Sequence, residues 1–174
     1  CDGVTSTVML YTHLDAIGAD VQWYIPTREE GYGLNENAIR KLHDDGTGLI
    51  ITVDNGVSAV NEAELIYELG MKLVITDHHQ LPEILPRAEA IVNPHRRDDT
   101  SPYKELAGCG VALKLIMALE RDVEGVLEQY ADLAAIGTIG DVVALTGENR
   151  IIVKRGLLEM QYSENQGLLS LIHE

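Results

Sequence analysis

The sequence predicts an α/β fold in which a parallel sheet carries helices on both faces and a mainly helical region follows. Short apolar runs rich in β-branched residues alternate with longer segments of helical periodicity over residues 1–99. Such alternation is typical of repeated β-α units that form a parallel sheet. Over residues 100–174 the pattern is mostly helical, and no Pro/Ser-rich linker separates the two parts. We therefore expect one domain over residues 1–174.

Four apolar runs have the length and composition of buried strands. They are Val21–Ile25, Leu49–Val53, Leu73–Thr76 and Ala90–Val92. The carboxyl ends of parallel strands meet at one edge of a sheet, where ligands gather in this class of fold. We therefore expect the functional residues directly after these runs.

Apolar residues at helical spacing predict the helices. In the first helix Val8, Met9, Leu14 and Ile17 mark one face, and Gly46 and Gly70 end the next two. The expected helices are Thr5–Ile17, Asn35–Asp45, Ser58–Leu69, Cys109–Glu120, Val123–Ile139, Arg150–Tyr162 and Leu168–His173.

Composition limits the classes of function. The formal net charge is -15, from 28 acidic and 13 basic residues, which argues against a broad nucleic-acid footprint on this chain alone. Two cysteines, Cys1 and Cys109, cannot form a disulfide framework, and no apolar run is long enough to span a membrane. We expect a cytoplasmic protein. The chain starts with Cys and has no signal-peptide pattern, which suggests that it is part of a longer protein.

Metal-binding side chains follow two neighbouring strands. Asp54 comes directly after Leu49–Val53, and Asp77, His78 and His79 come directly after Leu73–Thr76. Carboxylates mixed with imidazoles suit Mn²⁺ or Mg²⁺, and the lack of paired cysteines argues against a structural zinc site.

Two further acids fit the same edge. Asp2 lies at a first β-α turn, and Asp141 lies at a helix end among glycine and apolar residues. Each acid alone also fits a turn, a helix cap or a solvated position. Their convergence favours a cation site, because several unpaired acids at one edge would repel one another.

Candidate substrate contacts are less specific. Gly108 and Gly110 precede an apolar helix whose N-terminus could hold a phosphate, although a plain glycine turn explains them too. His95 and Arg96 belong to the only compact basic patch of the sequence. Arg96 could bind a phosphate through two N–H groups of its guanidinium. The alternative is that this patch is a solvated loop. Tyr32 lies in a loop after the first expected strand and could stack on a base or lie free on the surface.

Taken in order, these segments are similar to those of a known family. The chain resembles the DHH phosphoesterase superfamily, whose name describes the triplet Asp77, His78 and His79. Within that superfamily it resembles the RecJ-type single-strand-specific exonucleases. The shared segments are Asp2–Thr7, Glu30–Asn35, Val53–Gly56, Val92–His95, Ala107–Ala112 and Ile139–Val143.

The resemblance implies a Rossmann-like domain that uses two Mn²⁺ or Mg²⁺ ions to hydrolyse phosphodiester bonds of single-stranded DNA from the 5′ end, in DNA repair and recombination. By position, it implies that the metal ligands are Asp2, Asp54, His78 and Asp141. It also implies that His79 contacts the substrate phosphate and that Asp77 orients the histidines.

The departure from the family lies at the amino end. The family has another metal-binding Asp two positions before Asp2, on a first strand inside the sheet, and both would precede Cys1. The family's later domains, which help to hold DNA, are also absent, so this chain alone can be inactive. Neither the residues nor the resemblance fixes the oligomeric state.

Two other functions remain open. One is a phosphodiesterase, oligonucleotidase or pyrophosphatase of the same superfamily that acts on small substrates. The other is a non-catalytic α/β binding module stabilised by one cation. No Gly-x-Gly-x-x-Gly follows a strand, which argues against a dinucleotide-binding domain.

Overall fold

A parallel sheet positions the residues expected to be functional. The computed structural model describes residues 1–27, 29–163 and 165–172. Within these residues the sheet has three strands in the order β1-β2-β3: β1 (Leu49–Val53), β2 (Lys72–Thr76) and β3 (Ala90–Val92). Val53 pairs with Thr76, and Thr76 pairs with Val92, so all three strands end at one edge. Asp54, Asp77 and Asn93 follow these ends directly.

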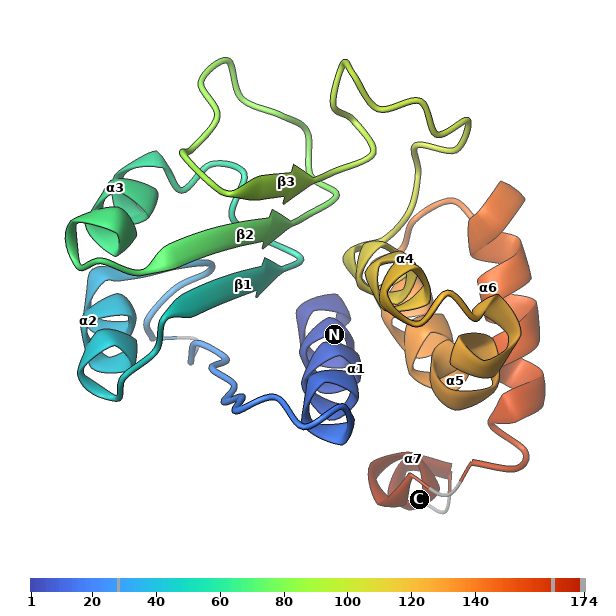
Figure 1. Cartoon of the computed structure of the whole chain (residues 1–174). Helices are drawn as coiled ribbons and strands as arrows, with labels where there is room; N and C mark the ends of the chain where they lie inside the picture. Colours follow the sequence, from blue (N-terminus) through green and yellow to red (C-terminus); the bar gives the residue numbers. More distant parts are fainter. Residues whose placement is uncertain (28, 164, 173–174) are drawn as a thin grey trace.

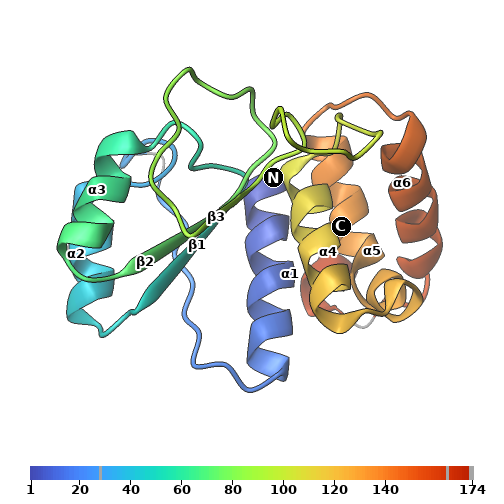
Figure 2. The ribbon, with the colours of Figure 1, turned by 45° about the horizontal axis from the view of Figure 1, so that its top comes forward.

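Helices cover both faces of the sheet, as the sequence predicts (Figures 1 and 2). On one face, α2 (Glu36–Asp44) and α3 (Val60–Glu68) pack on the strands, and they bury Ile39, Ile66, Leu73 and Ile75. On the other face lie α1 (Asp2–Ala16) and α4 (Gly108–Glu120), whose core includes Met9, Leu113 and Val53 of β1. The sheet therefore separates two apolar clusters.

The second half of the chain is helical. α5 (Val123–Gly140) contacts α1 and α4, and α6 (Gly147–Glu159) packs against α5. A glycine allows this close approach, because a Cβ at Gly156 would lie 2.1 Å from the carbonyl oxygen of Ala131. α7 (Gln166–Ile172) ends the described chain; the expected last helix extended to His173, which lies outside the described residues. In the part of the chain that is described, no helix has the length and apolar character needed to cross a membrane.

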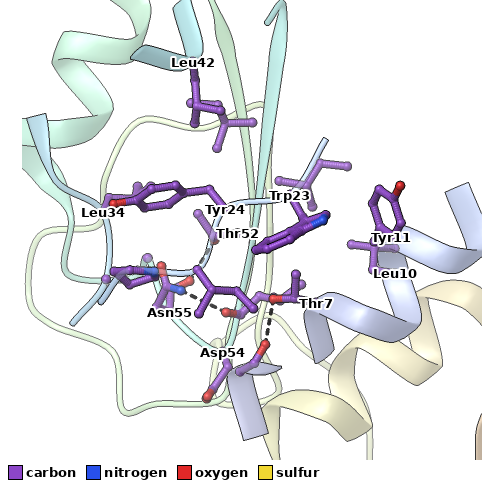
Figure 3. A pocket seen from close by; sticks show the side chains of 18 of the residues that line it. Thr7, Leu10, Tyr11, Trp23, Tyr24, Leu34, Leu42, Thr52, Asp54 and Asn55 are labelled. Carbon is purple, nitrogen blue, oxygen red and sulfur yellow. Dashed lines mark hydrogen bonds between the residues drawn. The ribbon is translucent and has the colours of Figure 1, made fainter. Parts of the chain in front are cut away.

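The expected strand at Val21–Ile25 is wrong. Among the described residues, 21–26 make no backbone hydrogen bond to another part of the backbone, and Trp23 is exposed. A groove of about 1260 Å³ lies between this segment and β1, and Trp23, Tyr24 and Thr52 are among the residues that line it (Figure 3). A strand forms only where a neighbouring backbone can pair with it, and the groove keeps Val21–Ile25 apart from β1.

Candidate metal centre

The turn after β1 places the Asp54 carboxylate at the edge of the sheet. Asp54 has a φ of 57°, in the left-handed region that few residues other than glycine adopt. Hydrogen bonds from Thr52 Oγ1 to the Asn55 carbonyl (2.8 Å) and from Asn55 Nδ2 to the Val53 carbonyl (2.9 Å) hold the turn. Gly56 is required next, because a Cβ there would lie 2.6 Å from Thr52 Oγ1.

Three carboxylates surround the imidazole of His78. Its Nε2 lies 3.1 Å from Asp54 Oδ1, 3.7 Å from Asp141 Oδ2 and 3.8 Å from Asp2 Oδ2. These side chains come from the ends of β1 and β2, the start of α1 and the end of α5. The structure therefore brings together all four residues that the resemblance marks as metal ligands.

The donor atoms form two overlapping groups. In the described part of the chain, Asp54, His78 and His79 form one group of possible ligands, and Asp2, His78 and Asp141 form the other. Within each group, the ligand atoms lie within 4.8 Å of one another. His79, which the resemblance marks as a phosphate contact, thus also lies within reach of a cation held by Asp54.

The electrostatics of the cluster favour a cation. Burial lowers the pKa of His78, but Asp54, Asp141 and Asp2 outweigh burial and raise this pKa above its usual value. Burial raises the pKa of Asp141; His78 opposes this rise, and Asp2 adds to it. Asp54 Oδ1 and His78 Nε2 are buried and face each other at 3.1 Å, and neither makes a hydrogen bond to any other described residue. Buried atoms of this kind need a partner, and a divalent cation can satisfy both.

Asp2 occupies the helix N-terminus that the sequence suggested for a phosphate. Its buried carboxylate accepts hydrogen bonds from the backbone N–H groups of Gly108 (2.7 Å) and Cys109 (2.8 Å) at the start of α4. Gly110 is buried and packs against Leu106. The anion at this helix dipole is therefore a side chain of the chain itself, which occupies the Gly108 N–H, and the phosphate contacts expected at Gly108 and Gly110 stay a prediction.

Gly108 has a steric role in the site. A Cβ at this position would lie 2.6 Å from Asp54 Cβ and 2.9 Å from Asp2 Oδ2. Only glycine lets α4 approach both carboxylates this closely. Gly140 has a similar role at the end of α5, where a Cβ would lie 2.8 Å from Cys1 Cβ.

Asp77 is a buried anchor for the turn after β2. Its side chain is 1% exposed, and its Oδ1 accepts hydrogen bonds from the backbone N–H groups of His78 (2.8 Å) and His79 (3.1 Å) and from His79 Nδ1 (2.7 Å). Its Oδ2 accepts from the Val57 N–H (3.1 Å). The side chain of His79 is 58% exposed. Asp77 therefore fixes the His79 ring by Nδ1 and leaves Nε2 available.

The remaining predicted substrate contacts lie outside the metal-ligand groups. Arg96 donates two hydrogen bonds to Asp98 (2.8 and 2.6 Å) and one to the Ile91 carbonyl (2.9 Å), so its fork binds a carboxylate of the chain. His95 lines a second cavity, of about 460 Å³, next to Gln80. Tyr32 is fully exposed and lies on the groove beside β1.

Asn93 belongs to a segment quoted for the family resemblance, but the sequence suggested no role for it. It follows β3, is 2% exposed, and hydrogen-bonds both to the His79 carbonyl and to the His95 N–H. Its position directly after a predicted strand, as for Asp54 and Asp77, was the signal that could have identified it.

The fold and the cluster define a metal-binding domain of a known class. A model of the DHH family, N-terminal domain, matches residues 1–138. This match covers most of the chain, and the chain therefore belongs to the DHH family.

Within the DHH family, the chain is similar to exonucleases of one type. The chain is 50% identical over 173 residues to the single-stranded-DNA-specific exonuclease RecJ of Bacillus subtilis and 39% identical over 170 residues to that of Escherichia coli. The matches cover 98% and 90% of this chain, and 22% and 30% of those proteins. The chain thus spans less than a third of the length of these relatives.

Solved structures agree with the sequence matches. A crystal structure of exonuclease RecJ bound to manganese has a TM-score of 0.85 at 41% identity, over 96% of this chain and 43% of that one. RecJ from Thermus thermophilus in complex with Mn²⁺ has a TM-score of 0.81 at 37% identity, over 99% of this chain and 25% of that one. These similarities confirm the predicted resemblance and the α/β fold class.

Proposed function

We propose that this chain is the metal-binding core of a single-strand-specific DNA exonuclease that hydrolyses phosphodiester bonds with Mn²⁺ or Mg²⁺. The observation that carries the proposal is the convergence of Asp2, Asp54, His78 and Asp141 from four elements, in which buried Asp54 Oδ1 and His78 Nε2 face each other and have no other hydrogen-bond partner among the described residues. The names of the relatives support the substrate class, and the titles of the related structures support the metals.

The donor set fits divalent ions of this kind. Carboxylates together with an imidazole suit Mn²⁺, and Asp2, Asp54, His78 and Asp141 would hold the ions. His79, in the other group of possible ligands, would remain for the substrate phosphate. Ions held there would polarise phosphoryl oxygens and lower the pKa of water at the site.

The side chains of the protein have separate tasks in this proposal. Asp2 keeps lone pairs for a cation while two backbone N–H groups hold its carboxylate in place. Asp77 holds His79 by Nδ1, so Nε2 faces the exposed side, where a scissile phosphate would enter. Ordering these groups before substrate binds reduces the reorganisation that the reaction requires.

Binding of the DNA strand belongs mostly to other parts of the whole protein. The net charge of -15 gives this chain little attraction for a polyanion, and Asp98 already neutralises Arg96. Action from the 5′ end and a role in repair and recombination rest on the family resemblance. Both cysteines are free, which supports the cytoplasmic location as part of the same proposal.

Calorimetric titration with Mn²⁺ tests the metal site. We compare the chain, its Asp54→Ala variant, the control Asp44→Ala in α2, and a version extended upstream by the strand that the resemblance implies. We expect about one ion in the chain, about two in the extended version, and none in Asp54→Ala. The Asp44→Ala control should bind like the unchanged chain, because this exposed aspartate lies outside the cluster.

Cleavage assays on the full-length protein then separate the candidate functions. Mn²⁺-dependent degradation of a single strand, with duplex DNA and dinucleotides spared, supports the proposal. Preference for dinucleotides would identify a small-substrate phosphodiesterase instead. Metal-dependent stability without cleavage would identify a binding module, and binding that does not depend on Asp54 would refute the metal site itself.

A further inference from the structure

Asn93 connects two turns at the carboxyl edge of the sheet. It follows β3 as Asp54 follows β1 and Asp77 follows β2. Its Nδ2 donates to the His79 carbonyl (2.9 Å), and its Oδ1 accepts from the His95 N–H (2.8 Å). The side chain thus joins the turn that carries His79 to the turn that carries His95.

His79 is held from two sides as a result. Asp77 accepts hydrogen bonds from the backbone N–H and the Nδ1 of His79, and Asn93 donates a hydrogen bond to the His79 carbonyl. The ring is nevertheless 58% exposed, and it lies beside the His78 ring, with centroids 4.5 Å apart. The position of this exposed ring therefore depends on two buried side chains behind it.

An amide is the side chain that this position requires. Asn93 is 2% exposed, so each of its polar atoms needs a partner inside the protein. Asn supplies one donor and one acceptor, and the structure uses both. Aspartate of the same shape would keep the acceptor for the His95 N–H but would place a carboxylate oxygen against the His79 carbonyl.

We propose that Asn93 is a positioning residue that fixes His79 for contact with the substrate phosphate. The proposal rests on the function proposed above and deepens it. The metal ligand His78 makes no hydrogen bond to the Asn93 side chain; its N–H donates to Asp77, and its ring lies among the carboxylates. Loss of the Asn93 amide should therefore disturb His79 much more than the metal site.

Kinetics of two variants test this role. In Asn93→Asp and Asn93→Ala we expect kcat on single-stranded DNA to fall about 10- to 100-fold, the usual effect of removing a group that orients an active-site histidine. Mn²⁺ affinity and KM should stay within about threefold, because neither the metal ligands nor the binding surface changes. Both kcat and KM are measured on the full-length protein.

The matched control is Asn149→Asp in α6. Asn149 is also a fully buried amide, and its Nδ2 donates to the carbonyls of Glu105 (2.5 Å) and Ala144 (3.1 Å). This variant should lose thermal stability as the Asn93 variants do while kcat stays within about twofold, which separates positioning from general destabilisation.

Amide exchange and histidine NMR give a readout that does not need activity. The His95 N–H should stay protected in Asn93→Asp and exchange rapidly in Asn93→Ala, while the His79 ring should lose its single orientation in both variants. Unchanged kcat in both variants would overturn the proposal, and so would Mn²⁺ affinity that falls in step with kcat. If the unchanged protein binds Mn²⁺ but cleaves no DNA, the exonuclease proposal fails, and an unaltered His79 ring in both variants then overturns the positioning role separately.

Discussion

Two residues at this site have left-handed backbone, which residues other than glycine seldom adopt. Among the described residues, Asp54, Arg121 and Val142 are the non-glycine residues with positive φ. Asp54 is a member of the cluster, and Val142, with a φ of 62°, directly follows Asp141. Left-handed backbone is costly for a β-branched residue and persists where surrounding contacts enforce it, as often happens at functional sites. The placement of both acids is therefore part of what the fold stabilises.

The two cysteines should differ sharply in reactivity. Burial raises the pKa of the Cys109 thiol far above its usual value, and Asp2 adds to this effect. Because the thiolate is the reactive form, Cys109 should stay protonated and unreactive from pH 7 to about pH 9. Exposed Cys1 should react with iodoacetamide in the folded chain, whereas Cys109 should react only after denaturation. Mass spectrometry of the labelled chain measures both, and rapid labelling of folded Cys109 would contradict its burial.

At the scale of elements, the site depends on how α4 meets the ends of α1 and β1. The N-terminus of α4 holds Asp2 by two backbone N–H groups, and Gly108 leaves space for Asp54. In the sequence, glycine before an apolar helix suggests a phosphate-binding site. In the structure, the same helix dipole instead stabilises the Asp2 carboxylate, which belongs to the cluster of possible metal ligands.

Substitutions in α4 test this arrangement. Gly108→Ala should displace the carboxylates, because its Cβ would lie 2.6 Å from Asp54 Cβ and 2.8 Å from Asp54 Oδ1. We expect Mn²⁺ affinity to fall at least about tenfold while the helix content by circular dichroism is retained. Gly110→Ala is the control, because its Cβ meets a flexible leucine end at 3.1 Å, and its Mn²⁺ affinity should change little. Equal loss in both variants would indicate general damage to α4.

In the whole molecule, the cluster lies between two regions, one on each face of the sheet. Asp54 and His78 come from the sheet, whose strands pack on α2 and α3. Asp2 and Asp141 come from α1 and α5, which belong to the apolar cluster on the other side. A cation that bridges these four side chains would therefore link the two regions and stabilise the folded state as a whole.

Thermal unfolding measures this link. At Mn²⁺ about 100-fold above its Kd, binding should stabilise the chain by about 2.7 kcal/mol. For a chain of this length, that free energy corresponds to a rise in Tm of about 5 to 10 °C. EDTA should abolish the rise, and Asp54→Ala should show none. A similar rise in Asp54→Ala would mean that Mn²⁺ binds elsewhere.

Much of the fold and of the candidate site can be predicted from residue patterns alone. Periodicity identified β1, β2, β3 and the helices, because burial of one face imposes a repeat that can be read along the chain. Because the carboxyl ends of parallel strands meet at one edge of a sheet, the sequence also predicted that Asp54, Asp77 and His78 lie at the same edge. Asp2 and Asp141 joined them through convergence of charge and the family resemblance, and the structure brings both within 4 Å of His78.

Which groups pair with one another becomes clear only in the folded chain. Val21–Ile25 has the composition of a strand but has no backbone beside it to pair with. The sequence offers Arg96 as a possible phosphate contact, but in the structure its guanidinium binds Asp98 and the Ile91 carbonyl. Asp2 binds the N–H groups of Gly108 and Cys109, which lie 106 and 107 residues away in the chain. Local patterns report burial and turns, whereas hydrogen-bond partners distant in sequence are set only when the helices pack.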